Sequence, residues 1–138
     1  MKKKIEQMYK DFANALGRLK EVLKENPSAG SIVVDGTIQR FEFTFELAWK
    51  LMKAILAYNG IEAATPRQAI KEGFRANIIE DGDSWIDMME DRNKTSHIYD
   101  ENQALVIYNK IKNNHFKVME NFLQNSRKFA GLEDEKAG

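Results

Sequence analysis

The sequence of 138 residues contains no cysteine, which excludes disulfides, thiol nucleophiles and thiolate metal sites. It contains two histidines, His97 and His115, too few to favour a histidine-rich zinc site. No apolar run approaches the roughly 18–20 residues that a membrane span requires. The basic start Met-Lys-Lys-Lys leads directly to Glu6 and Gln7, so no signal-peptide segment is indicated. We therefore expect a cytoplasmic protein without a membrane association, a metal or a cofactor.

The chain also lacks a net charge, because 21 basic residues balance 21 acidic ones. A broad nucleic-acid surface usually appears as a basic excess, and the composition shows none. The charges are nevertheless unevenly placed. Residues 80–101 carry eight acids and two bases, whereas residues 109–128 carry five bases and one acid. Any anion-binding site must be explained by this asymmetry and not by the total charge.

Helix-breaking residues are scarce, with two prolines and eight glycines in the chain. Apolar residues recur at threes and fours through residues 5–23 and again through residues 105–122, which is typical of helices with one buried face. The spacing predicts an all-α protein, an antiparallel up-and-down four-helix bundle with one short extra helix at 66–72. We expect one bundle domain over residues 1–125 and a polar C-terminal tail over residues 126–138.

Turn signals separate the expected helices. The stretch Pro27-Ser28-Ala29-Gly30 ends the first helical segment, and Asn59-Gly60 ends the second with residues suited to a left-handed cap. Thr65-Pro66-Arg67-Gln68 combines an N-cap threonine, a proline at the first helical position and a glutamine at the capping-box position. Asp81-Gly82-Asp83 predicts a turn that caps the next helix.

The segment 40–55 predicts a helix with an unusually wide apolar arc. On a helical wheel Glu42, Glu46, Lys50 and Lys53 form one polar stripe about 80° wide, and apolar residues cover most of the rest. Such a helix must be buried on two sides, either as the central helix of the bundle or against a second subunit. We predict a homodimer. Glu46 and Lys50 either form a surface pair or place a carboxylate at a site.

The segment from Trp85 to Asp100 contains most of the candidate chemistry. On the wheel Arg92 falls on the apolar face of this helix, beside Met88. The other charged side chains are expected to point to solvent: Asp87, Glu90, Asp91 and Lys94. A lone buried charge is very costly, so Arg92 needs a partner. It either caps the bundle against a carboxylate such as Glu42 or Glu46, or it serves a functional site.

His97 follows Arg92 by five residues, which places the two about 140° apart on an unbroken helix. They can converge only if the helix ends or distorts near Thr95-Ser96, or if they meet across a subunit interface. Asn93 lies four residues before His97 and can share its face. Tyr99 is either an apolar filler with a wet tip or a member of a site at this helix-to-helix junction. His115, in the middle of a helix face, is expected to be structural.

The segment Arg92-Asn93-Lys94-Thr95-Ser96-His97-Ile98-Tyr99 matches the Arg-x4-His-x-Tyr motif of HEPN domains. Together with RFEFTFELAWKLMK at 40–53 and TPRQAIKEGFRANII at 65–79, it makes the chain resemble the nucleotidyltransferase substrate-binding protein family. The resemblance extends over about residues 5–123. It implies a dimeric four-helix bundle that pairs with a separate minimal nucleotidyltransferase.

Related HEPN proteins are metal-independent ribonucleases, and many are toxins of toxin–antitoxin pairs. For this chain the resemblance implies that His97 takes the proton of an RNA 2′-hydroxyl and that Arg92 holds the phosphate, supported by Asn93. Such chemistry requires RNA and spares DNA. In the paired systems the nucleotidyltransferase adds AMP to the tyrosine of the motif, which is Tyr99 here.

Three functions stay open at the level of sequence. The chain is the substrate-binding or partner subunit of a two-component nucleotidyltransferase system, an active HEPN ribonuclease toxin switched off at Tyr99, or a structural dimer without chemistry. In the first two, Glu42, Glu46 and Lys50 form a supporting polar stripe. The chain lacks the Gly-Ser-x10-Asp-x-Asp signature, so it is not itself the catalytic nucleotidyltransferase subunit.

Overall fold

The computed structural model describes residues 2–29 and 31–131, and this part of the chain is helical without strands. The α-helices are α1 (Lys2–Leu23), α2 (Ser31–Tyr58), α3 (Pro66–Arg75), α4 (Gly82–Lys94), α5 (Glu101–Lys110) and α6 (Phe116–Ser126). Two 3₁₀ turns, η1 (Pro27–Ala29) and η2 (Thr95–His97), and a π-helical segment, η3 (Ile111–His115), complete the order. Because α5, η3 and α6 form one continuous run, the four-helix bundle with one short extra helix is confirmed. None of the described helices is both long enough and apolar enough to span a bilayer.

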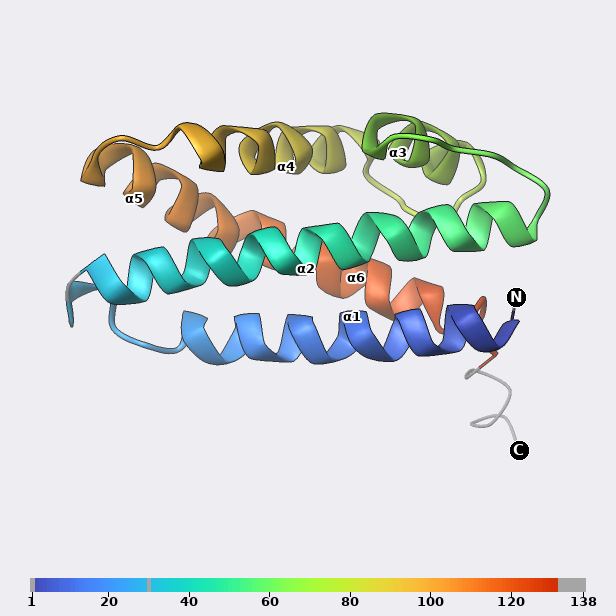
Figure 1. The fold of residues 1–138 in the computed structure, drawn as a ribbon, viewed down its shortest axis with the longest axis horizontal. Helices are drawn as coiled ribbons and strands as arrows, with labels where there is room; N and C mark the ends of the chain where they lie inside the picture. The colour runs from blue at the N-terminus through green and yellow to red at the C-terminus, as the bar shows by residue number, and fades with distance from the viewer. Residues whose placement is uncertain (1, 30, 132–138) are drawn as a thin grey trace.

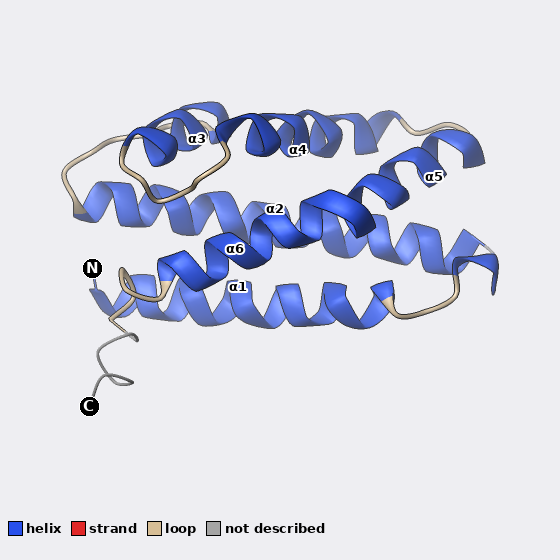
Figure 2. Cartoon of the chain, turned by 180° about the vertical axis from the view of Figure 1, so that it is seen from behind, coloured by secondary structure: helices blue, strands red, loops and turns tan. Residues whose placement is uncertain are grey.

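Helix α2 is the central helix of the bundle. In Figure 1 it lies between α1 on one side and α3 and α4 on the other, while the α5–α6 run crosses behind it. Figure 2 shows the same run from the opposite side, in front of α1 and α2. Contacts of α2 with α1, α3, α4 and α5 explain its wide apolar arc within a single chain. Of the two explanations that the sequence allowed, the central position is therefore the one observed, and dimerisation stays a prediction.

The predicted caps define the ends of the helices. Gly60 has a φ of 80° just after α2, the left-handed conformation that glycine adopts without strain. The Thr65 hydroxyl accepts a hydrogen bond from the Gln68 N–H at 3.2 Å, and Gln68 Oε1 accepts one from the Ala64 N–H at 2.8 Å. Helix α3 continues to Arg75, three residues beyond the predicted end at residue 72. It continues because Ala69, Ile70 and Gly73 are buried on one face of the helix, against its neighbours.

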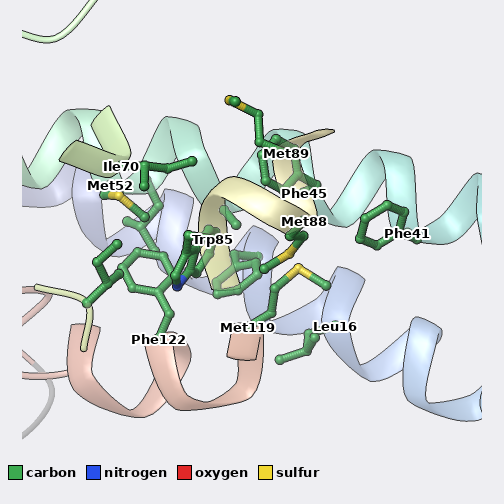
Figure 3. Packing of buried hydrophobic residues seen from close by; sticks show 14 of the residues in the cluster. Leu16, Phe41, Phe45, Met52, Ile70, Trp85, Met88, Met89, Met119 and Phe122 are labelled. Carbon is green, nitrogen blue, oxygen red and sulfur yellow. The ribbon is translucent and has the colours of Figure 1, made fainter. Parts of the chain in front are cut away.

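An aromatic cluster fills the centre of the bundle (Figure 3). Trp85 of α4 is 1% exposed, and its ring meets that of Phe122 edge to face with centroids 5.5 Å apart. Phe45 of α2 packs on the other side of Trp85 with centroids 6.3 Å apart. This cluster joins α2, α4 and α6, so it fixes the helix that carries the Arg-x4-His motif.

Packing continues beyond residue 125, the predicted end of the bundle domain. Ser126 is fully buried and donates a hydrogen bond to the Leu123 carbonyl oxygen at 2.9 Å. Ala130 is 2% exposed, and Phe129 packs against the core. The first residues of the expected tail thus belong to the bundle, and residues 132–138 lie outside the described residues.

Candidate functional site

The Arg-x4-His-x-Tyr segment lies at the junction between α4 and α5. Helix α4 supplies Arg92 from its last turn, and the 3₁₀ turn η2 supplies His97. Asp100 then caps α5, because its side chain accepts a hydrogen bond from the Gln103 N–H at 2.8 Å. The α-helix therefore ends near Thr95-Ser96, which is one of the two conditions under which Arg92 and His97 can converge.

Arg92 has the carboxylate partner that its position on the apolar face required. Its Nη1 lies 3.4 Å from Glu42 Oε2, and both side chains are about one-third exposed or less. The Thr95 hydroxyl links the pair, because it accepts from Arg92 Nη1 at 3.3 Å and donates to Glu42 Oε2 at 2.7 Å. Arg92 Nε is buried and has no hydrogen-bond partner among the described residues. One edge of the guanidinium is thus engaged, while another nitrogen is left unsatisfied.

His97 has different surroundings. Its exposed side chain lines a cavity of about 280 Å³ between α4 and α5, together with Lys94, Gln103 and Lys110. Within the described part of one chain, no hydrogen bond or ion pair joins it to Arg92. The convergence of the two side chains on one cleft therefore stays a prediction.

Tyr99 is 81% exposed, so it does not fill the core as a packing residue would. Its N–H donates to Gln103 Oε1 at 2.9 Å, which fixes the backbone while the ring stays accessible. The residue lines a second cavity, of about 510 Å³, whose acidic members are Asp35, Asp100 and Glu101. Tyr99 and His97 thus line adjacent cavities and not a single one.

The supporting polar stripe on α2 does not form one site. Glu42 joins Arg92, whereas Glu46 accepts a hydrogen bond from Trp49 Nε1 at 3.1 Å. Over the described ranges Lys50 has no ion pair with Glu46, and it lines a separate cavity at the far end of α2. Asn93 is exposed at the end of α4, and its carbonyl oxygen accepts a hydrogen bond from the Ser96 hydroxyl at 3.1 Å.

The prediction that Asp91 points to solvent is wrong. Asp91 is 1% exposed, and its Oδ2 lies 2.6 Å from His115 Nε2 and 2.7 Å from Lys110 Nζ. The prediction failed because α4 is covered on two sides. Helix α2 packs against one side, and the α5–η3 run covers the side that carries Asp91. One signal in the sequence pointed to a buried partner: His115 lies on an apolar helix face, and a buried imidazole needs a hydrogen-bond partner. His115 itself is structural, as predicted: it is fully buried and stacks on Phe41 with centroids 5.5 Å apart.

The charges in this buried cluster stabilise one another. Burial alone would raise the pKa of Asp91, but hydrogen bonds from His115 and Lys110 outweigh it and lower that pKa. Burial alone would lower the pKa of Lys110, and its bonds to Asp91 and Asp87 raise it instead. Asp87, Asp91 and His115 have the donor types and spacing to hold a metal ion. The ammonium group of Lys110 already contacts both carboxylates, so it supplies the positive charge there.

Comparisons with known proteins agree with this architecture. A family model described as nucleotidyltransferase substrate binding protein like matches residues 7–128. Among curated proteins, a probable ribonuclease HepT of Haemophilus influenzae is 34% identical over 84 residues, which cover 57% of this chain and 58% of that protein. The chain therefore matches little more than half the length of that relative.

Solved structures share the fold. A structure from Thermus thermophilus superposes with a TM-score of 0.77 at 32% identity, covering 84% of this chain and 98% of that one. A second, from Haemophilus influenzae, is described as having the fold of a substrate binding domain of a nucleotidyltransferase. It superposes with a TM-score of 0.66 at 22% identity, covering 92% of this chain and 99% of that one, and it shows likeness of fold alone.

Proposed function

Because this chain belongs to the nucleotidyltransferase substrate-binding protein-like family, we propose that it is the substrate-binding or target subunit of a two-component nucleotidyltransferase system. The observation that carries the proposal is the 81% exposure of Tyr99 at the junction before α5. An accessible phenol on a fixed backbone can enter the active site of another protein without unfolding the bundle. The partner is a separate minimal nucleotidyltransferase, and the complex works in the cytoplasm.

In this proposal the partner transfers AMP from ATP to Tyr99. The phenol oxygen attacks the α-phosphorus of ATP, the bond between that phosphorus and the bridging oxygen breaks, and pyrophosphate leaves. The phenol proton passes to a base of the partner or to water. This chain supplies the acceptor and its orientation, through the Gln103 bond to the Tyr99 N–H and the Asp100 cap of α5.

A second candidate function is a metal-independent ribonuclease that uses Arg92 and His97. Two observations favour it: the buried, unpartnered Nε of Arg92 together with the exposed side chain of His97, and the name of the Haemophilus relative, a probable ribonuclease. His97 would take the proton of a 2′-hydroxyl, and the resulting oxygen would attack the adjacent phosphorus. The bond to the 5′-oxygen of the next nucleotide breaks and that oxygen takes a proton from water, which leaves a 2′,3′-cyclic phosphate and a 5′-hydroxyl. Arg92 would hold the phosphate, and a homodimer would bring the two side chains together.

The two functions combine in one switch. AMP on Tyr99 would place a negative phosphodiester and a purine beside the cavity of His97, and would exclude RNA by occupancy and by repulsion. Arg92 could pair with the new phosphate. The purely structural dimer is the alternative that lacks both activities.

The test is to mix the chain with the nucleotidyltransferase encoded next to it, ATP and magnesium, and to measure the intact mass. The wild type should gain mass in steps of one AMP, and Tyr99→Phe should gain none. Tyr58→Phe is the matched control, because Tyr58 is 52% exposed at the end of α2 and outside both cavities. Equal modification of Tyr99→Phe and the wild type, or no modification of the wild type, would contradict the proposal.

A further inference from the structure

A third cavity, of about 350 Å³, lies between α1 and the C-terminal half of α2 and has no part in the proposed function. Figure 1 shows these segments side by side at the end of the bundle where α1 begins. The residues of this cavity that carry the argument are Lys4 and Met8 of α1 and Trp49, Lys50 and Lys53 of α2. Along α2, Trp49 lies about 21 Å from Asp35, which lines the Tyr99 cavity.

The rim of the cavity is positively charged. Lys4, Lys50 and Lys53 all line it, and no acidic residue does. In the described part of the chain none of the three has a carboxylate within 4.0 Å, whereas Lys10 and Lys110 do. These ammonium groups are therefore available to an anion, although the chain as a whole has no net charge.

The interior of the cavity suits a flat apolar group. The Trp49 indole is fixed by its 3.1 Å hydrogen bond to Glu46, and Lys53 Nζ lies 5.9 Å from the ring centroid. Two small side chains of α2, Ala54 and Ala57, also line the cavity. A planar ligand can therefore approach the α2 surface closely between Trp49 and the Met8 side chain.

We propose that this cavity binds a nucleotide, with its base against Trp49 and its phosphate at Lys50 and Lys53. An aromatic ring beside unpaired cations is the combination that proteins use to bind single-stranded nucleic acid, where bases stack and phosphates contact lysines. A free mononucleotide and one nucleotide of a single RNA strand share this chemistry. The site does not rest on the proposed function, because it shares no lining residue with the cavities of Tyr99 and His97.

Tryptophan fluorescence of the full chain tests the proposal directly. The sequence has two tryptophans, and Trp85 is 1% exposed in the core, so quenching by a ligand reports on Trp49. AMP and a short single-stranded oligoadenylate are the probes, and ribose 5-phosphate is the competitor that lacks a base. AMP quenching would identify a free-nucleotide site, and quenching by the oligonucleotide alone would identify a strand site. Ribose 5-phosphate should compete at least about tenfold more weakly than the probe that binds, because it cannot stack.

Two double variants separate this site from general charge effects. Lys50→Gln with Lys53→Gln should weaken binding about tenfold or more and make it less sensitive to salt. Lys20→Gln with Lys24→Gln removes the same charge from exposed positions in the last turn of α1 and just after it, and should bind as the wild type does. Tyr99→Phe should also bind normally, so a failure of AMP transfer and a failure of nucleotide binding are distinguishable. The proposal is overturned if neither probe quenches, if ribose 5-phosphate competes equally, or if the Lys50/Lys53 variant binds with unchanged affinity.

Discussion

His115 Nε2 lies 2.6 Å from Asp91 Oδ2, and the two side chains are 0% and 1% exposed. This bond joins the π-helical segment of the last helical run to α4, one residue before Arg92. It gives the helix that carries the Arg-x4-His motif a fixed polar anchor inside an otherwise apolar core. Lys110 contacts the same carboxylate oxygen from the solvent side at 2.7 Å.

Loss of this anchor should be costly. Asp91→Ala leaves the His115 imidazole and the Lys110 ammonium without their buried partner, and breaking a buried charged pair typically costs about 3–5 kcal/mol. We expect a decrease of about 3 kcal/mol in the free energy of unfolding, measured by urea denaturation with circular dichroism. Glu90→Ala is the matched control, because Glu90 is exposed on the same helix and should change stability by less than about 0.5 kcal/mol. Equal effects of the two substitutions would show that the buried pair does not stabilise the fold.

The same pair predicts how stability depends on pH. The pKa of Asp91 is lower in the folded chain than in the unfolded one, so its contribution is complete above the unfolded pKa of about 3.9. That contribution is lost as the pH falls through the lowered folded pKa. The difference in unfolding free energy between wild type and Asp91→Asn should therefore be constant near neutral pH and shrink below about pH 4. A difference that stays constant through the acid range would contradict the assignment.

If the chain is a ribonuclease, Arg92 and His97 must act together. Arg92→Ala and His97→Ala should each reduce RNA cleavage by at least about 100-fold and abolish growth inhibition in cells that express the chain. Asn109→Ala alters an exposed polar residue of α5 outside both cavities and should keep full activity. Cleavage of a labelled RNA without added metal is the measurement. Growth inhibition that persists in His97→Ala would contradict the ribonuclease function, and only the partner function would remain.

The structure indicates which residues would form the interface of the predicted homodimer. Central packing explains most of the apolar arc of α2, but Ile32 is 82% exposed and Phe43 is 61% exposed. Sedimentation at micromolar concentration should show a species of twice 15.9 kDa, and Phe43→Glu should shift it toward the monomer. Phe74→Glu is the control, since Phe74 is 51% exposed on α3. A single species of 15.9 kDa in the wild type would exclude the dimer.

Local signals in the sequence were sufficient for the helices and their caps. Thr65 and Asp81 each cap a helix as predicted, because capping depends on residues three positions away. The partner of Arg92 was also predictable, since the wide apolar arc of α2 left few carboxylates, Glu42 among them, to face an arginine on α4.

The buried environment of Asp91 was not predictable from the helical wheel. A wheel shows which side chains share a face, but it does not show how many neighbouring helices cover that face. Asp91 is buried because Lys110 at the end of α5 and His115 in η3 both contact its carboxylate. The different neighbours of His97 and Arg92 were likewise not predictable: His97, in the turn η2, lines a cavity with residues of α5, whereas Arg92 contacts Glu42 of α2.

The π-helical segment Ile111–His115 sets the rotational phase of the last helical run. A π-turn holds one more residue than an α-turn, so everything after it is rotated relative to a regular helix. With this offset the two halves of one continuous helical run pack against different helices: α5 packs against α2, and α6 packs against α1. Deleting one residue from within the segment would restore regular α-helical winding, but it would turn one half by about 100° against the other. Homologous chains that lack the extra residue would then have to build the anchor of α4 from a different position in the run.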